Sequence, residues 1–298
     1  MSGRNRVTKT YKLFIGGRFP RSESARSLAV AGRDDGTVLV SRASRKDLRD
    51  AAESARAGHE AWFAGTSYLR AQILYRLAEM IEGKREELVS EIALSVHATS
   101  SRSRAQTRGT SASEEVSLAI DRVIHYAGWA DKYHQVLGCA NPVSGPYHNF
   151  TIPEPIGVVG VIAPNESPLL ALVSLVMPVI CCGNSCVALA SEVNPIPACI
   201  FAEAVATCDM PPGVINILTG VREELVPYFA AHRGIAGLHA AGVTPAERET
   251  LELGVVENFK RIKAWATPPA WHDRASCESP EWIEPFVDFK TIWHPSST

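Results

Sequence analysis

The most regular pattern of apolar positions lies in the middle of the chain. Residues 156–163 form an unbroken apolar run rich in β-branched side chains, which is typical of a strand buried on both faces of a parallel sheet. Pro164 ends this run, and a polar loop at 165–168 separates it from an apolar stretch of helical length. The pattern then repeats, with prolines and glycines at the boundaries. It predicts strands at 156–163, 187–190 and 214–218 and helices at 169–182 and 198–208, a βαβαβ unit of the kind found in nucleotide-binding sheets.

The flanking segments carry shorter patterns. Residues 98–113 are rich in Ser, Thr and Arg and lack apolar periodicity, so we expect a flexible, solvated loop there. Apolar residues in alternation with turn residues predict a hairpin at 11–18, and an apolar run predicts a strand at 286–293. Apolar residues at helical spacing predict helices at 44–61 with Ser44 as the N-cap, at 68–96, from 113 onward and at 244–256.

Composition narrows the class of protein. The chain has 298 residues, of which 46% are hydrophobic and 21% charged, enough to form a globular core. Its net charge of −2 gives no electrostatic signature for nucleic acid or a membrane surface, and no apolar run is long enough for a membrane-spanning helix. The basic N-terminal residues lack the apolar segment of a secretory signal, and the cysteine count of seven is odd. We therefore expect a reducing, cytoplasmic location.

Residues 154–220 resemble the cofactor-binding core of the aldehyde dehydrogenase superfamily. Residues 155–164 read PIGVVGVIAP, Gly183 and Asn184 follow the helix, Ser191 and Glu192 follow the second strand, and residues 211–220 read PPGVINILTG. The resemblance implies an α/β fold with a Rossmann-like cofactor-type domain at 1–265 that contains the flexible loop at 98–113. It also implies a C-terminal tail at 266–298, whose segment 286–293 resembles the small β-element through which family members oligomerise. The catalytic domain of the family, expected after residue 262, has no counterpart in the sequence.

Aldehyde oxidation requires a thiolate nucleophile, a donor that stabilises the oxyanion and a general base. Cys277 is the only cysteine beyond the cofactor block and lacks the family's neighbouring residues. Glu166 aligns with the family's oxyanion-stabilising asparagine, where a carboxylate would repel an oxyanion, and Asn165 is a weak substitute. Glu252 stands in an ELG sequence like that of the family base, but a predicted helix favours a surface charge there. We expect no catalytic residue, and the buried-type cysteines at 181, 182, 186, 199 and 208 lack zinc-site spacing.

The resemblance also implies which residues would line a nucleotide cleft. These are Ile162, Ala163, Pro164 and Asn165 after the first strand, Glu192 after the second and Gly220 after the third. Leu189 replaces the family lysine that reaches the ribose, while Glu192 retains the capacity to bond ribose hydroxyls. Residues 221–224 replace a glycine-rich turn, and Glu223 and Glu224 would oppose the phosphates. We expect no required cofactor, and at most weak binding of NAD or NADP.

Three functions stay open. The first is a non-catalytic family member, a pseudoenzyme that serves as scaffold or regulatory partner of an active aldehyde dehydrogenase. The second is an NAD(P)-dependent oxidoreductase that acts on aldehydes through Glu166, Cys277 or Glu252. The third is a nucleotide-sensing module without turnover. The apolar strand at 286–293 favours the first, because an exposed strand edge with such side chains needs a partner. We therefore expect a homo-oligomer or a hetero-oligomer with a full-length aldehyde dehydrogenase.

Overall fold

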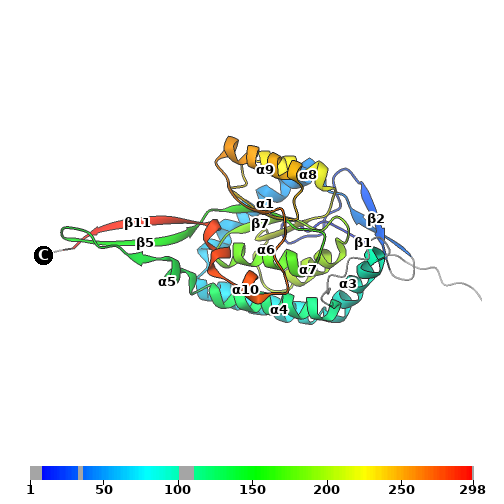
Figure 1. Ribbon diagram of the computed structural model, residues 1–298, viewed down its shortest axis with the longest axis horizontal. Coiled ribbons are helices and arrows are strands. Elements are labelled where there is room, and N and C mark those ends of the chain that lie inside the picture. The colour runs from blue at the N-terminus through cyan, green and yellow to red at the C-terminus, as the bar shows by residue number, and fades with distance from the viewer. Residues whose placement is uncertain (1–8, 33–35, 101–110, 297–298) are drawn as a thin grey trace, which may run out of the picture.

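The computed structural model describes residues 9–32, 36–100 and 111–296. Its centre is a parallel sheet with helices on both faces, and a narrow antiparallel sheet projects from one end (Figure 1). In spatial order the central sheet contains β10 (Arg261–Trp265), β9 (Gly237–Ala241), β6 (Val158–Ile162), β7 (Ser185–Leu189) and β8 (Ile215–Leu218). The expected α/β fold class is thus confirmed.

The order of strands reverses beside β6. The chain leaves β6 through α6 (Leu170–Cys181) to β7, continues through α7 (Ile196–Val205) to β8, and then crosses back to β9 on the other side of β6. Ile162 is consequently paired with Leu189 on one side and with Ala240 on the other. In open parallel sheets, ligands bind at the carboxyl ends of the strands where the order reverses. This point therefore fixes where a nucleotide site would lie.

Two helical layers cover the sheet (Figure 1). Helices α6 and α7 lie against one face, and every residue of α6 is buried because a second layer of helices packs outside it. That outer layer consists of α2 (Ser67–Glu82), α3 (Arg85–Ser100) and α4 (Ala112–Trp129), whereas the opposite face carries α1 (Arg45–Ala64), α8 (Arg222–Ala231) and α9 (Pro245–Asn258). No helix within the described ranges is long and apolar enough to cross a membrane.

Several local predictions are confirmed. The predicted strands and helices of the βαβαβ unit all form, with ends that shift by one to three residues. Helix α1 begins as expected after Ser44, whose hydroxyl accepts hydrogen bonds from the N–H groups of Lys46 and Asp47. The Asp47 carboxylate accepts from the Ser44 N–H in return, at 2.8 Å, and completes a capping box.

Other local predictions are wrong in part. The hairpin predicted at 11–18 forms only as a tight turn, which the antiparallel bridge between Ile15 and Arg18 closes. Its first strand, β1 (Thr10–Tyr11), pairs in parallel with β3 (Thr37–Ser41), which also pairs with β2 (Ser27–Ala31). The helix predicted at 68–96 is divided between α2 and α3. The loop predicted at 98–113 is shorter, because α3 continues through residue 100 and α4 starts at Ala112; residues 101–110 lie outside the described residues.

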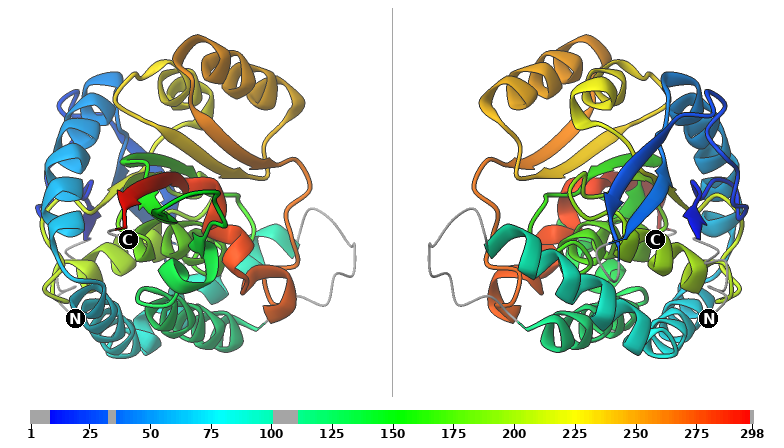
Figure 2. Two further views of the ribbon diagram at one scale, coloured as in Figure 1. Left: turned by 90° about the vertical axis from the view of Figure 1, so that its left-hand side faces the viewer. Right: turned by 90° about the vertical axis from the view of Figure 1, so that its right-hand side faces the viewer.

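The projecting sheet, which we call the arm, contains β4 (Cys139–Ala140), β5 (Tyr147–Pro155) and β11 (Val287–Pro295). Strand β11 pairs antiparallel with β5 along its whole length, from Val287↔Pro155 to Pro295↔Tyr147. The short helix α5 (Tyr133–Leu137) leads into the arm, and Figure 2 shows the arm end-on. The strand predicted at 286–293 is confirmed with a small shift, since Phe286 still belongs to a 3₁₀ turn, Glu284–Phe286.

Residues 266–286, which we call the connector, join β10 to the arm. The connector contains α10 (Arg274–Cys277) and two 3₁₀ turns, Pro280–Trp282 and Glu284–Phe286. It packs into the main core, because Trp271, Cys277, Trp282, Ile283 and Phe286 are all buried. Three aromatic rings surround the buried His239 ring of β9. Trp282 and Phe286 of the connector and Trp265 of β10 have ring centroids 5.6, 4.7 and 5.1 Å from that of His239.

Candidate functional site

The residues predicted to line a nucleotide cleft do lie at one edge of the central sheet. Ile162 ends β6 and residues 163–165 follow it, Glu192 follows β7, and Gly220 follows β8, so the parallel strands place all of them at their carboxyl ends. Hydrogen bonds link the loops at this edge, including Ala163 N–H to Leu189 O at 3.0 Å and Ala190 N–H to Leu218 O at 2.9 Å. The parallel strands thus bring these residues to one edge, where each side chain has contacts of its own.

Asn165 is used to hold two loops together. Its Oδ1 accepts hydrogen bonds from the backbone N–H groups of Glu192 and Val193, at 3.1 and 3.3 Å, and from the Ser191 hydroxyl at 3.2 Å. One amide oxygen thus fixes the loop after β7 against the loop after β6.

Glu192 is engaged by the start of a helix. Its Oε2 accepts a hydrogen bond of 2.8 Å from the backbone N–H of Arg222, the first residue of α8. A carboxylate is favoured at this place because the first N–H groups of a helix lack partners within the helix and carry partial positive charge. The oxygen expected to bond a ribose hydroxyl is therefore already an acceptor for the chain's own backbone.

Arg222 and Glu247 meet across the edge of the sheet. The Arg222 guanidinium donates to Glu247 through Nε, at 2.9 Å from Oε1, and through Nη2, at 3.3 Å from Oε2. The same group donates to the carbonyls of Ala163, at 2.6 Å, and Gly242, at 3.4 Å, which follow β6 and β9 respectively. Arg222 is only 7% exposed. It therefore bridges the two strands between which the strand order reverses.

Glu247 also caps a helix. Its Oε2 accepts from the Thr244 N–H at 2.8 Å, and its own N–H donates to the Thr244 hydroxyl, so α9 begins with a capping box. Burial opposes ionisation of Glu247, but hydrogen bonds from Arg222 and the Thr244 backbone outweigh it and hold the pKa of this carboxyl below its ordinary value. The Arg222–Glu247 contact is thus a charged pair.

The remaining predicted residues are explained by packing. Ile162 and Ala163 are fully buried. A Cβ on Gly220 would lie 2.8 Å from Leu225 Cδ1 and 3.4 Å from the Ala43 nitrogen, so a larger residue there would require the Leu225 side chain to shift. A Cβ on Gly242 would lie 2.9 Å from Pro164 Cβ, which shows how closely the turns after β6 and β9 approach.

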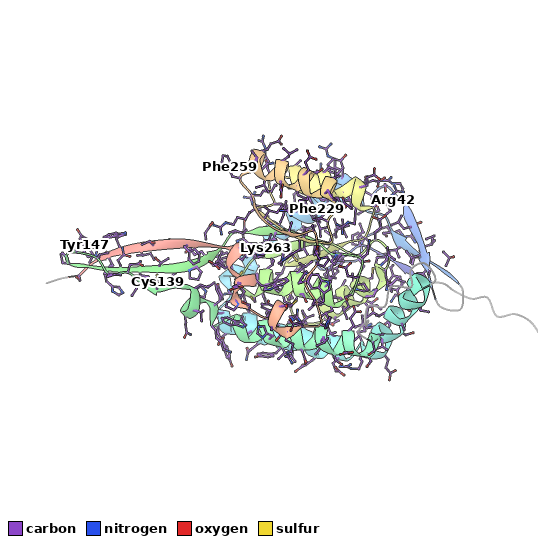
Figure 3. The ribbon with its side chains drawn as sticks, viewed as in Figure 1. Arg42, Cys139, Tyr147, Phe229, Phe259 and Lys263 are labelled. Carbon is purple, nitrogen blue, oxygen red and sulfur yellow. The ribbon has the colours of Figure 1, made fainter. Side chains whose placement is uncertain are left out.

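Glu223 and Glu224, the two carboxylates expected to face phosphates, lie elsewhere in the structure. Glu224 turns to Arg42, whose Nε lies 3.1 Å from Oε2, and Figure 3 labels Arg42 near β2. Glu223 is exposed and lines a separate hollow with Arg26, Arg45 and Glu224. The carboxylates that face the carboxyl edge are Glu192 and Glu247 instead.

None of the candidate catalytic residues has the surroundings that the chemistry requires. Cys277 is buried, and burial raises the pKa of its thiol, so a thiolate is disfavoured. Glu252 pairs with Arg248 on the surface of α9, with Nε–Oε1 at 2.7 Å, which confirms its interpretation as a helix-surface charge. Glu166 is exposed. Among the residues that the structure describes, no group of three or more His, Cys, Asp or Glu side chains is arranged to hold a metal ion.

The sequence reasoning missed Arg222 and Glu247. Each resembles an ordinary residue in the first turn of a helix, and the two are 25 positions apart. The available signal was the loss of the glycine-rich turn at 221–224 together with the capping sequence Thr244-Pro245-Ala246-Glu247. Only the neighbouring positions of β6 and β9 bring the two side chains together.

Comparisons with known proteins agree on one family. Residues 21–264 match the sequence model of the aldehyde dehydrogenase family. Retinal dehydrogenase 2 of Mus musculus is 31% identical over 267 residues, which cover 87% of this chain and 49% of that protein. The NAD+ complex structure of aldehyde dehydrogenase from Bacillus cereus is similar with a TM-score of 0.76 at 26% identity, over 86% of this chain and 50% of that one. A structure of a putative aldehyde dehydrogenase from Burkholderia cenocepacia gives the same four values. The chain spans about half the length of these proteins.

Proposed function

This chain belongs to the aldehyde dehydrogenase family, and we propose that it acts there as a non-catalytic subunit that assembles with other family subunits through its arm. The partner would be a second copy of the chain or a full-length aldehyde dehydrogenase, which the chain would support as scaffold or regulator. The observation that carries the proposal is the projecting arm, whose outer strand offers both a backbone edge and aromatic side chains.

The arm has the features of a strand-pairing surface. In the described residues β11 is paired on one side only, by β5, so its other edge leaves N–H and C=O groups without strand partners. Tyr147, Phe289 and Trp293 are 46%, 47% and 59% exposed. The rings of Tyr147 and Trp293 lie edge to face at 5.8 Å near the tip of the arm, where Figure 3 labels Tyr147. An added strand would satisfy the backbone groups and cover these rings.

The absence of turnover is supported by the side chains already described. The Cys277 thiol is buried with a raised pKa, Glu252 is paired with Arg248, and Glu166 is exposed. We propose that no cofactor is required. We also propose a reducing, cytoplasmic location, supported by the seven cysteines, all of which are free.

Light scattering of the purified chain, alone and with a full-length aldehyde dehydrogenase from the same cell, tests the assembly. The test variant is Phe289→Lys/Trp293→Lys, which adds two like charges to the arm. The control is Tyr68→Lys, because Tyr68 is an exposed aromatic residue, at 66%, that belongs to α2 and not to the arm. We expect the unmodified chain and the control to assemble and the arm variant to remain monomeric.

Other outcomes would contradict the proposal. A chain that stays monomeric both alone and with the full-length enzyme would exclude assembly. Oxidation of an aldehyde panel with NAD or NADP, lost in Cys277→Ala, would support the oxidoreductase instead. Binding of NAD without turnover in calorimetry would support the nucleotide-sensing module.

A further inference from the structure

Helices α8 and α9, which cover the same face of the central sheet, both begin at its carboxyl edge. Helix α8 follows β8 and helix α9 follows β9. A helix N-terminus in this position is where a doubly wound fold holds the phosphates of a dinucleotide, through free N–H groups and the positive end of the helix dipole. In this chain, each of the two N-termini already holds a carboxylate of the chain itself.

At α8 the internal anion is Glu192, whose Oε2 lies 2.8 Å from the Arg222 N–H. At α9 the internal anion is Glu247, whose Oε2 lies 2.8 Å from the Thr244 N–H. Between them lies the Arg222 guanidinium, which is held by the carbonyls of Ala163 and Gly242 as well as by Glu247. Two carboxylates and one guanidinium of the chain itself thus lie at the two helix N-termini.

This arrangement does not fit a bound dinucleotide. A diphosphate at either N-terminus would face a carboxylate at short range, and like charges repel most strongly where water is excluded. If the Glu247 side chain turned away to make room for the ligand, the Arg222 guanidinium would stay buried without its ion-pair partner, which is strongly unfavourable. The Glu247 side chain would also leave the capping box of α9.

We propose that Arg222 and Glu247 close the crevice to NAD and NADP by occupying it from within. The ion pair fills the position that the ligand would take, and it thereby prevents this cofactor-type fold from binding the dinucleotide. This inference is independent of the proposed assembly, because it concerns the opposite part of the molecule from the arm and is measured by nucleotide binding rather than by subunit association.

The test removes both charges and keeps the helix cap. In Arg222→Ala/Glu247→Gln the guanidinium is lost, while glutamine retains the capping-box contacts with Thr244. The matched control is Arg248→Ala/Glu252→Gln, which removes an exposed ion pair of the same residue types from α9, the helix of Glu247. A third variant, Glu247→Gln alone, removes the carboxylate charge but leaves the guanidinium in place. Calorimetry with NAD measures the Kd, and circular dichroism with thermal unfolding measures whether each variant is folded.

We expect NAD binding to become at least about tenfold tighter in Arg222→Ala/Glu247→Gln than in the unmodified chain, a change of about 1.4 kcal/mol. The control should show no gain. Glu247→Gln alone should gain less than the double variant, because it removes the repelling carboxylate but leaves the guanidinium in the crevice. If the alanine variant does not fold, Arg222→Gln/Glu247→Gln replaces it, because it keeps hydrogen-bonding side chains at both positions. The proposal is overturned if a folded double variant shows no gain over the unmodified chain, or if the unmodified chain binds NAD as tightly as the variant does.

Discussion

The Tyr126 hydroxyl of α4 donates a hydrogen bond of 2.9 Å to the backbone carbonyl of Cys277 in the connector. Neither residue is exposed to solvent, and 151 positions separate them in sequence. Arg122, one turn earlier in α4, donates to the Trp271 carbonyl at 3.1 Å and to the Glu278 carboxylate at 3.2 Å. The connector is therefore fixed to the outer helical layer by buried polar groups as well as by apolar contact, and such groups accept only a narrow range of positions.

Replacement of Tyr126 by Phe tests this attachment. The variant keeps the ring and leaves the buried Cys277 carbonyl without its donor, so the free energy of unfolding should fall by about 1–3 kcal/mol. Urea unfolding measures the change. Tyr68→Phe is the control, because the Tyr68 hydroxyl lies at the surface, where it accepts from Gln72, and we expect a change within about 0.5 kcal/mol. Equal effects of the two substitutions would contradict the attachment.

The buried His239 predicts sensitivity to acid. Its Nδ1 lies 2.8 Å from the Leu175 carbonyl, and burial among aromatic rings lowers its pKa to about 3. Below about pH 6.5 the imidazole takes up a proton in the unfolded chain but not in the folded chain. The free energy of unfolding therefore decreases as the pH is lowered from about 6.5 to 3, by about 1.4 kcal/mol per pH unit from this group.

His239→Gln removes the titrating group and keeps an amide that can donate to Leu175. Urea unfolding at pH 6.5, 5.5 and 4.5 should therefore show a shallower loss of stability in this variant than in the unmodified chain. His148→Gln, at an exposed position of the arm, should leave the slope unchanged. A parallel decline of all three proteins would show that His239 does not contribute.

Cysteine reactivity should single out one thiol. Cys139 is exposed on the arm, and the other six cysteines are buried. Burial raises the pKa of Cys186 and Cys199 to about 12, which suppresses the reactive thiolate. A disulfide reagent should therefore titrate one thiol rapidly in the folded chain, none rapidly in Cys139→Ser, and all seven in urea. Rapid reaction of a second thiol in the folded chain would contradict the described burial.

Two helical glycines should respond in opposite directions to alanine. A Cβ on Gly58 of α1 would lie 2.3 Å from the carbonyl carbon of Gly213, so Gly58→Ala must separate α1 from β8 and should cost about 1–3 kcal/mol. The Cβ on Gly128 of α4 would meet nothing closer than 3.5 Å, so Gly128→Ala should stabilise by about 0.5–1 kcal/mol. Thermal unfolding measures both, and a loss of stability in Gly128→Ala would be contrary to expectation.

The parts of the fold that could be predicted are those in which one segment carries its own pattern. Residues 156–163 and 169–182 are almost entirely apolar because sheet and helices bury them, and both elements appear as expected. The connector has no such periodicity, and its burial depends on donors in α4 that lie far away in sequence. The Arg222–Glu247 pair could not be predicted for a similar reason. Each residue fits the first turn of its own helix, and only the order of the strands brings the two side chains into contact.

The candidate site shows the same division. Its place followed from the strands, and so did the position of Gly220 after β8, where the glycine packs against Leu225 and Ala43. The role of Glu192 could not be predicted from the sequence, because a carboxylate after a strand fits a ribose hydroxyl as well as it fits the first N–H of a neighbouring helix. The choice between them depends on where α8 begins.

The pairing of β5 with β11 also sets an order of events during synthesis. Residue 155 pairs with residue 287, so β5 leaves the ribosome long before its longest partner exists. At about 5–20 residues per second, the delay is on the order of ten seconds. During that time β5 has only the two residues of β4 to pair with, and its edge is open to any other strand, including that of a neighbouring nascent chain. Completion of the arm is therefore a late step in biogenesis, and a chaperone that shields residues 147–155 would act in this interval.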